Sequence, residues 1–114
     1  MPHPTPEERH QHLLALTPRR LCEALDEGTV TVLCPRIDVP FLLRFLPQKK
    51  RFVAVRLDDL GSQVWRLLDG QRTAAQVAQA LAQNANLDPE DCARRVLIHL
   101  FALRARGAVA LREP

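Results

Sequence analysis

Few side chains in this sequence are spaced for catalysis. Asp58 and Asp59 form a carboxylate pair that could serve acid–base chemistry, but neighbouring acids ahead of an apolar stretch are typical of a helix start. The hydroxyls of Ser62 and Thr73 have no histidine or acid at the spacing of a nucleophile motif. No glycine-rich phosphate loop is present. We therefore predict no catalytic residues and expect a protein that is not an enzyme.

The cysteines and histidines are also poorly placed for a metal centre. The chain has three cysteines without the close spacing of a zinc site, and we interpret them as buried free thiols (Cys22, Cys34 and Cys92). In the proline-rich N-terminus, His10 and His12 would face different sides of a helix. We expect neither a bound metal nor a cofactor.

The basic residues gather in two bands. The net charge is only +3, yet residues 44–56 hold five basic residues and residues 92–112 hold five arginines, both without an acid. Such bands are usually solvated surface, but they also suit an acidic partner. The chain has no apolar run of 18 residues and no N-terminal secretory signal. We therefore expect a cytoplasmic protein without a membrane partner.

Turn residues and apolar alternation predict the elements of the first half of the chain. Four prolines mark the N-terminal segment as an arm, and a short loop containing Gly28 joins two strands into a hairpin. In the next strand, Val53 and Val55 alternate with Phe52 and Ala54. In order, we expect an arm at 1–18 with a helical turn over 7–16, hairpin strands at 20–25 and 29–34, an insert at 36–50, and a third strand at 51–57.

Three helices are predicted after the third strand, followed by a short extended piece at 108–111. Each helix begins with a capping signal: Asp58 ahead of 59–68, a Thr73–Gln76 capping box ahead of 74–83, and Asp88-Pro89 ahead of 89–106. The sequence thus predicts an α+β domain over 19–114. Its expected architecture is winged helix-turn-helix-like, with a three-stranded antiparallel sheet followed by three helices.

The third predicted helix has a wide apolar surface. At about 100° per residue, four residues form one stripe with two more beside it, which is enough to cover a core (Cys92, Val96, Leu100 and Leu103, with Ala93 and Leu97 beside them). Ile98, Phe101 and Ala105 extend the apolar arc. They leave a narrow polar strip, where His99 is expected to be exposed (Arg95, His99 and Arg106). The extra apolar residues either pack under the insert or the arm, or line a groove together with Leu97.

The third strand suggests what such a groove would bind. If the sheet order follows the chain, this strand is an edge whose free backbone groups can pair with an added strand. The basic bands would flank that slot if the third helix lies beside it, so we predict an acidic, extended peptide as the ligand. The expected contacts are the strand (Arg51, Phe52, Val53, Ala54, Val55 and Arg56) and a helix wall (Leu97, Ile98 and Phe101, with Arg94 and Arg104 at its margins).

The segment from Val55 to Ala78 resembles the signature of the PqqD family, named after pyrroloquinoline quinone biosynthesis protein D. The family pattern is roughly L-D-x-x-G-x-x-x-W-x-L-x-D-G-x-x-T-x-x-E-I. It is carried here by eight residues, with Gln76-Val77 in place of Glu-Ile (Leu57, Asp58, Gly61, Trp65, Leu67, Asp69, Gly70 and Thr73).

This resemblance implies a recognition element for ribosomally made, post-translationally modified peptides. Such a domain binds the leader of the precursor peptide as an extra strand against the third strand and third helix. It presents the peptide to a modifying enzyme, often a radical SAM protein. The 36–50 insert is longer than in the short family members, which favours a peptide pathway other than quinone biosynthesis.

Two other classes of function remain open. A winged-helix DNA-binding protein would insert the N-terminal end of its third helix into the major groove. Here that end carries Asp88, Glu90 and Asp91, which phosphates repel, so nucleic acid is not the expected partner. A structural or dimerisation domain would use the same apolar groove against a second copy.

Overall fold

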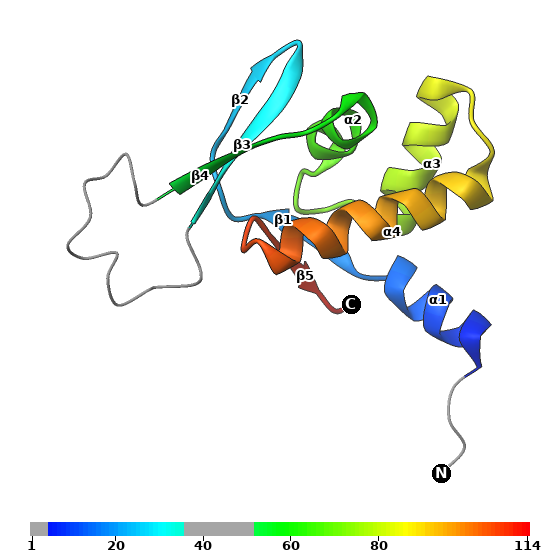
Figure 1. Cartoon of the computed structure of the whole chain (residues 1–114). Helices are drawn as coiled ribbons and strands as arrows, with labels where there is room; N and C mark the ends of the chain where they lie inside the picture. Colours follow the sequence, from blue (N-terminus) through cyan, green and yellow to red (C-terminus); the bar gives the residue numbers. More distant parts are fainter. Residues whose placement is uncertain (1–4, 36–51) are drawn as a thin grey trace.

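The computed structural model describes residues 5–35 and 52–114 (Figure 1). The predicted insert at 36–50 and the candidate residue Arg51 lie outside the described residues. Within the described ranges the chain forms four helices and five strands: α1 Pro6–Leu14, β1 Thr17–Arg20, β2 Ala24–Glu27, β3 Thr29–Pro35, β4 Phe52–Arg56, α2 Asp59–Leu67, α3 Ala74–Ala85, α4 Pro89–Ala105 and β5 Val109–Arg112.

The expected sheet is present. Strands β2, β3 and β4 form an antiparallel sheet in that order, and α2, α3 and α4 follow it in the chain. The α+β class, with a three-stranded antiparallel sheet followed by three helices, is therefore confirmed. A fourth helix, α1, precedes the sheet, and β1 pairs with β5 in a separate two-stranded sheet.

The predicted first strand at 20–25 is wrong, because the chain changes partner inside it. Up to Leu21 the backbone bonds to the C-terminal segment, with Leu21 N donating to Ala108 O at 2.9 Å. From Glu23 onward it bonds to β3, with Leu33 N donating to Glu23 O at 3.0 Å. The hairpin is also tighter than expected: β2 continues to Glu27, and Gly28 turns the chain with a φ of 91°.

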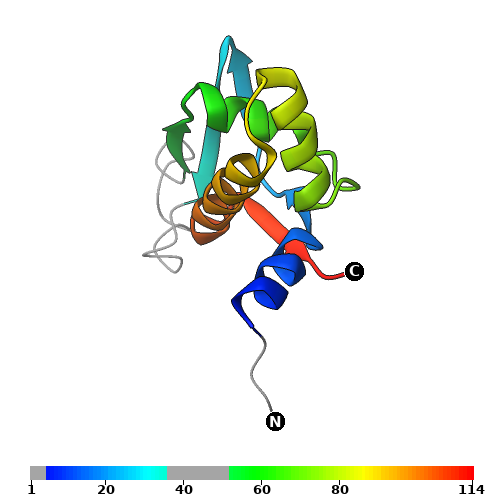
Figure 2. The same cartoon turned by 90° about the vertical axis from the view of Figure 1, so that its right-hand side faces the viewer.

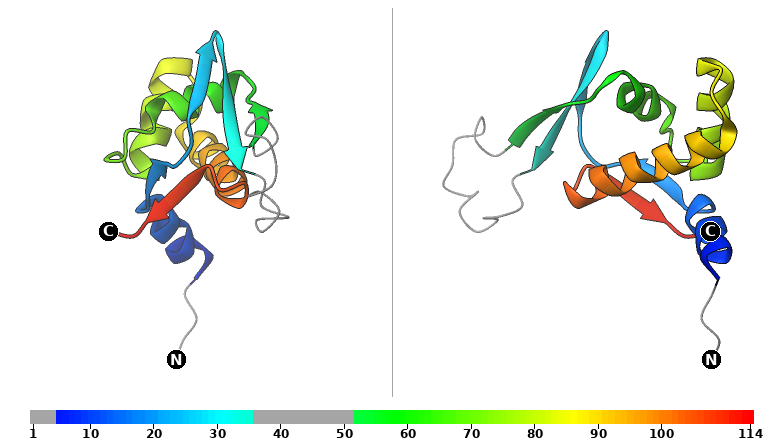
Figure 3. Two further views of the ribbon diagram at one scale, coloured as in Figure 1. Left: turned by 90° about the vertical axis from the view of Figure 1, so that its left-hand side faces the viewer. Right: turned by 45° about the vertical axis from the view of Figure 1, so that its right-hand side comes forward.

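The core lies between the three-stranded sheet and the helices (Figure 2). Val30, Val32 and Cys34 alternate along β3 and are at most 2% exposed. Their side chains pack with those of α2, α3 and α4, and β5 closes the core through Val109. Figure 3 shows the helices on one side of the sheet, with no described helix on the other side. One face of the sheet therefore carries the apolar core.

Helix α1 lies against α3 and α4 (Figure 1). A capping box between Thr5 and Glu8 starts it, and none of its residues is fully buried. Leu16 and Pro18 directly after it are buried, and β1 begins at Thr17. Helix α1 and the start of β1 thus lie within residues 1–18, the segment that we predicted as an arm.

Candidate functional site

The hydrogen bonds of β4 show which of its backbone groups face the edge of the sheet. Leu57 N donates to Val30 O at 2.8 Å, directly after β4 ends. Because bonding direction alternates along an antiparallel strand, Val53 and Val55 also point their backbone groups at β3. Phe52, Ala54 and Arg56 therefore present their N–H and C=O groups at the outer edge. Among the described residues, β4 pairs with no strand other than β3.

A serine hydroxyl replaces a β4 carbonyl as the hydrogen-bond acceptor at the point where β4 ends. Val30 N, which a continued strand would satisfy with a carbonyl, instead donates to Ser62 Oγ at 2.9 Å. Ser62 is 1% exposed on the first turns of α2, whose N-cap is Asp58. The carboxylate of Asp58 accepts a hydrogen bond from Gly61 N. The turn from β4 into α2 is therefore held by groups on both sides of it.

The inner face of β4 is more open than that of β3. Residues opposite one another on the two strands share a face, so Val53 and Val55 lie on the same side as Cys34 and Val32. Val53 is nonetheless 40% exposed, whereas Cys34 opposite it is 2% exposed. Phe52, on the outer face, is 44% exposed. The strand thus borders a space that no described side chain fills completely.

The buried stripe of α4 is as predicted, since its four residues and the two beside it are at most 8% exposed. His99, however, is half-buried where we expected it to be exposed, and the reason lies in α2. A Cβ atom at Gly61 would stand 3.3 Å from His99 Cε1 and 3.3 Å from Leu57 Cβ. The absent side chain of Gly61 therefore leaves room for the imidazole beside the end of β4.

The predicted helix wall is spread over several sides of α4. A shallow depression separates α1 from the first turns of α4, with His10 and Leu14 on one side and Ala93 and Arg94 on the other. Leu97 continues the Ala93 row one turn on and is 7% exposed. It therefore faces the side of α1 and the core, away from the β4 edge.

The remaining wall residues lie further round the same helix. Phe101 is half-buried, and the guanidinium of Arg104 lies 5.8 Å from its ring. Phe101 and His99 are two positions apart, so they project about 160° apart around the helix. Ile98 is 68% exposed between these directions. The α4 face next to β4 is consequently the one that holds His99.

Sequence reasoning identified this polar strip but assigned it no role. Arg95 and Arg106 share the side of His99, at the spacings of one and two helical turns. Arg106 is exposed, and Arg95 donates to the Asp91 carboxylate at 2.9 Å. The strip itself could have indicated this side of the helix. A row of polar residues that interrupts a wide apolar surface shows which side of a helix does not pack on the core.

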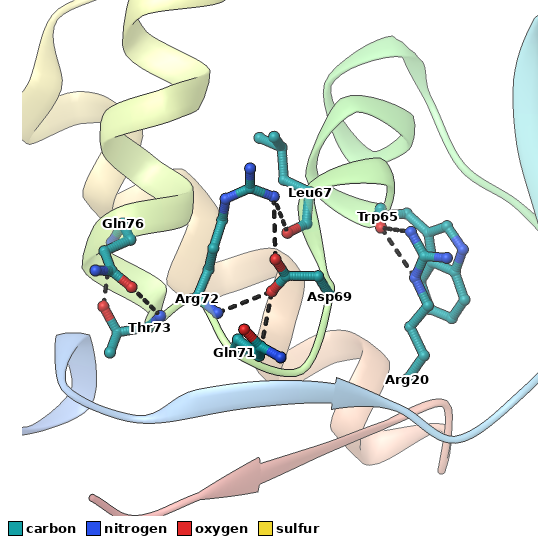
Figure 4. Close-up of polar contacts among 8 residues, drawn as sticks. All are labelled: Arg20, Trp65, Leu67, Asp69, Gln71, Arg72, Thr73 and Gln76. Atoms are coloured by element: carbon teal, nitrogen blue, oxygen red, sulfur yellow. Dashed lines mark hydrogen bonds and ion pairs between the residues drawn. The ribbon is translucent and has the colours of Figure 1, made fainter.

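Several residues of the signature make contacts that join α2, the following turn and α3 (Figure 4). Trp65 is 3% exposed, and its carbonyl oxygen accepts from the guanidinium of Arg20, which also lies 5.2 Å from the indole ring. Asp69 accepts from two backbone N–H groups in the turn before α3. These contacts hold β1, α2 and α3 together, and none of them points a polar group at the β4 edge.

Local hydrogen bonds lower the pKa of two carboxylates, Asp69 and Asp26. The pKa of Asp69 is lowered by the backbone N–H groups of Arg72 and Gln71. The pKa of Asp26 is lowered by its side-chain hydrogen bonds with Arg66. Both carboxylates are thus held ionised by contacts of the scaffold. Across residues 5–35 and 52–114 no cluster of three metal-ligating side chains is found, and no helix there is long and apolar enough to cross a membrane.

Comparison with known protein families shows to which family this chain belongs. A family model described as coenzyme PQQ synthesis protein D (PqqD) matches residues 48–109, more than half of the chain. The chain belongs to the PqqD family. The PqqD match includes β4, α2, α3 and α4. No curated protein and no solved structure gives a significant match. Membership of the PqqD family supports a role in the biosynthesis of PQQ or of a related modified peptide.

Proposed function

We propose that this protein is a peptide-binding domain and not an enzyme. It binds the leader of a ribosomally made precursor peptide by β-strand addition at β4 and presents that peptide to a modifying enzyme, such as a radical SAM protein. Membership of the PqqD family supports the biosynthetic context. The observation that carries the binding mode is the outer edge of β4, which pairs with no further strand within residues 5–35 and 52–114 and presents a row of outward backbone groups.

Strand addition fits the chemistry of this edge. Among the described residues, the outward groups of Phe52, Ala54 and Arg56 pair with no other strand, and an extended peptide would satisfy them with its own backbone. The half-open inner face at Val53 offers apolar contact to alternate side chains of the peptide. An added strand therefore gains both main-chain bonds and a place for side chains.

The charges near the edge favour an acidic peptide. Arg56 is exposed at the end of β4, and Arg106 is exposed on the α4 strip. Neither of these arginines has a carboxylate within ion-pair distance among the described residues. Peptide carboxylates would gain attraction to them without first displacing a partner. We therefore assign the helix side of the binding site to the strip of Arg95, His99 and Arg106.

Amide hydrogen exchange tests this assignment residue by residue. The probe is the synthetic leader segment of a candidate short precursor peptide. On binding, the amides of Phe52, Ala54 and Arg56 should become protected. The amides of Val53 and Val55 are the internal control, because they already bond to β3 and should be protected in both states. Saturable leader binding without new protection at the outward amides would exclude strand addition at β4.

The same preparation separates the two other functions. A winged-helix DNA-binding protein should bind duplex DNA with an affinity that falls steeply with salt. A dimerisation domain should show a concentration-dependent change of mass in sedimentation, and β4 amides protected without any peptide. We expect a monomeric protein that binds the leader and does not bind duplex DNA.

A further inference from the structure

Two of the three cysteines lie near the junction of β2 and β3: Cys22 stands two residues before β2, and Cys34 is in β3. The register pairs Ala24 with Val32, and the bond from Leu33 N to Glu23 O extends that register by one pair. Continued by one more residue, this register would place Cys22 opposite Cys34, at the bend where the chain changes its partner from β5 to β3. The third thiol, Cys92, is fully buried at the start of α4.

The position of this pair in the ladder suits a disulfide. Leu33 and Glu23 form a hydrogen-bonded pair, so the neighbouring pair of Cys22 and Cys34 falls at a non-hydrogen-bonded site. At such sites the two Cα atoms stand about 4.5 Å apart and the side chains approach most closely. Disulfides require Cα atoms about 4.4 to 6.8 Å apart. The register next to the pair is therefore compatible with a bond between these two cysteines.

The two thiols share neighbours near the C-terminal end of α4. Cys22 Sγ lies 3.4 Å from Gly107 O, directly after α4. Cys34 is on the inner face of β3, and the charge of Arg106, next to Gly107, acts on it. Burial raises the pKa of both thiols, and the pKa of Cys34 is raised further by the nearby Cys22. Cys22 Sγ thus lies at the C-terminal end of α4, and the register next to it brings Cys34 to the same region.

Access to the pair comes from one side. Cys34 is 2% exposed, whereas Cys22 is half-buried and lines a surface depression with Arg20, Trp65 and Arg66. An oxidant therefore reaches Cys22 first, and Cys34 is placed to react second. Cys92 is 0% exposed and belongs to a different element, so it takes no part.

We propose that Cys22 and Cys34 form a modification site, at which a peroxide closes a cross-strand disulfide. The Cys22 thiolate attacks one peroxide oxygen, the O–O bond breaks, and a first water leaves while Cys22 becomes a sulfenic acid. The Cys34 sulfur then attacks Cys22, the S–O bond breaks, and a second water leaves. Two thiols lose two electrons, and hydrogen peroxide is reduced to two waters that carry both thiol protons. The site does not depend on peptide binding.

Mass spectrometry of the full-length protein tests the proposal. The protein is treated with hydrogen peroxide at mildly alkaline pH, because the raised pKa of these thiols disfavours the thiolate at neutrality. It is then unfolded and alkylated. We expect the protein mass before alkylation to fall by two hydrogens. Only Cys92 should then be alkylated, and digestion should give two peptides linked through Cys22 and Cys34. Dithiothreitol should restore three alkylated thiols.

Three variants make the result decisive. Cys22→Ser should abolish the intramolecular link, whereas Cys92→Ser should leave it intact. Cys34→Ala should also abolish it, and Cys22→Ser gives the same information if the buried position does not tolerate alanine. A protein that keeps three alkylatable thiols, that links through Cys92, or that accumulates overoxidised Cys22 without a link would overturn the proposal.

Discussion

The two edges of the three-stranded sheet differ in chemistry, although both strands pair only with β3 among the described residues. β2 ends in Asp26 and Glu27, and Asp26 is bound through both carboxylate oxygens to Arg66 of α2. Arg66 also donates to Gly28 O at 2.8 Å, so it fastens the hairpin turn. The five residues of β4 contain four apolar side chains, one arginine and no acid.

This difference indicates that only one edge is suited to accept another strand. A charged side chain directed inward at an edge opposes pairing, and the Asp26 carboxylate has that position on β2. The acids of β2 would also repel an acidic peptide, whereas Arg56 on β4 attracts one. The sheet is thus asymmetric: β2 is protected against strand addition, and β4 remains available for it.

The largest expected effect comes from matched proline substitutions at the two edges. Ala54→Pro removes an outward N–H from β4, and Ala24→Pro removes the corresponding outward N–H from β2. Proline is tolerated in edge strands when its missing N–H faces outward. We expect Ala54→Pro to weaken leader binding about a hundredfold, where each tenfold step is about 1.4 kcal/mol. Calorimetric titration measures both variants, and equal losses in the two would remove the asymmetry.

The junction of β4 and α2 should matter for the stability of the sheet. Ser62→Ala leaves the buried N–H of Val30 without its acceptor. A buried donor without a partner costs about 1–3 kcal/mol of unfolding free energy. Urea unfolding measures this loss. A decrease below about 0.5 kcal/mol, the usual range for surface substitutions, would show that the hydroxyl does not support β3 at this position.

Charge reversal at the two edges should change the affinity for the leader by a smaller factor than the proline substitutions. Arg56→Glu places an acid on β4, and we expect about tenfold weaker binding of an acidic leader, an effect that added salt reduces. Glu27→Lys on β2 is the matched change and should leave the affinity unaltered. Titrations at low and high salt measure both variants. An equal response of the two would mean that net charge, and not the position of the arginine, controls binding.

The smallest effect concerns the ion pair that protects β2. The guanidinium of Arg66 holds the pKa of Asp26 below its ordinary value, so the folded protein favours the ionised carboxylate. The resulting stabilisation is present above the ordinary pKa of aspartate and is lost as the pH falls through the lowered folded-state pKa. Asp26→Asn should therefore lower the thermal midpoint slightly at neutral pH and not in strong acid. Both partners are exposed, which keeps the effect small.

The sequence predicted those features that depend on near neighbours. Asp58, Thr73 and Asp88 cap their helices as expected, because a cap involves residues within four positions of one another. The alternation of Val53 and Val55 correctly gave the two faces of β4, because strand periodicity is local. The buried stripe of α4 follows from its helical period in the same way.

Other features depend on tertiary neighbours that the local pattern does not contain. Thr17 pairs with Arg112 from the far end of the chain, so the shift of the first strand to β1 had no local signal. The helical period placed His99 and Phe101 on different sides of α4 but did not say which side meets β4. That choice depends on Gly61, whose missing side chain admits His99. The peptide-binding residues therefore stay a prediction.

The shortness of β4 has a consequence for how a leader would be positioned. Three outward positions would hold the peptide, and a shift of the peptide by two residues keeps every side chain on its original face. Such a slip sacrifices the bonds of one position only, so the backbone discriminates weakly between neighbouring alignments. One or two side chains of the leader would then set the alignment. These anchoring residues would decide how far along the precursor the first modified residue lies from β4.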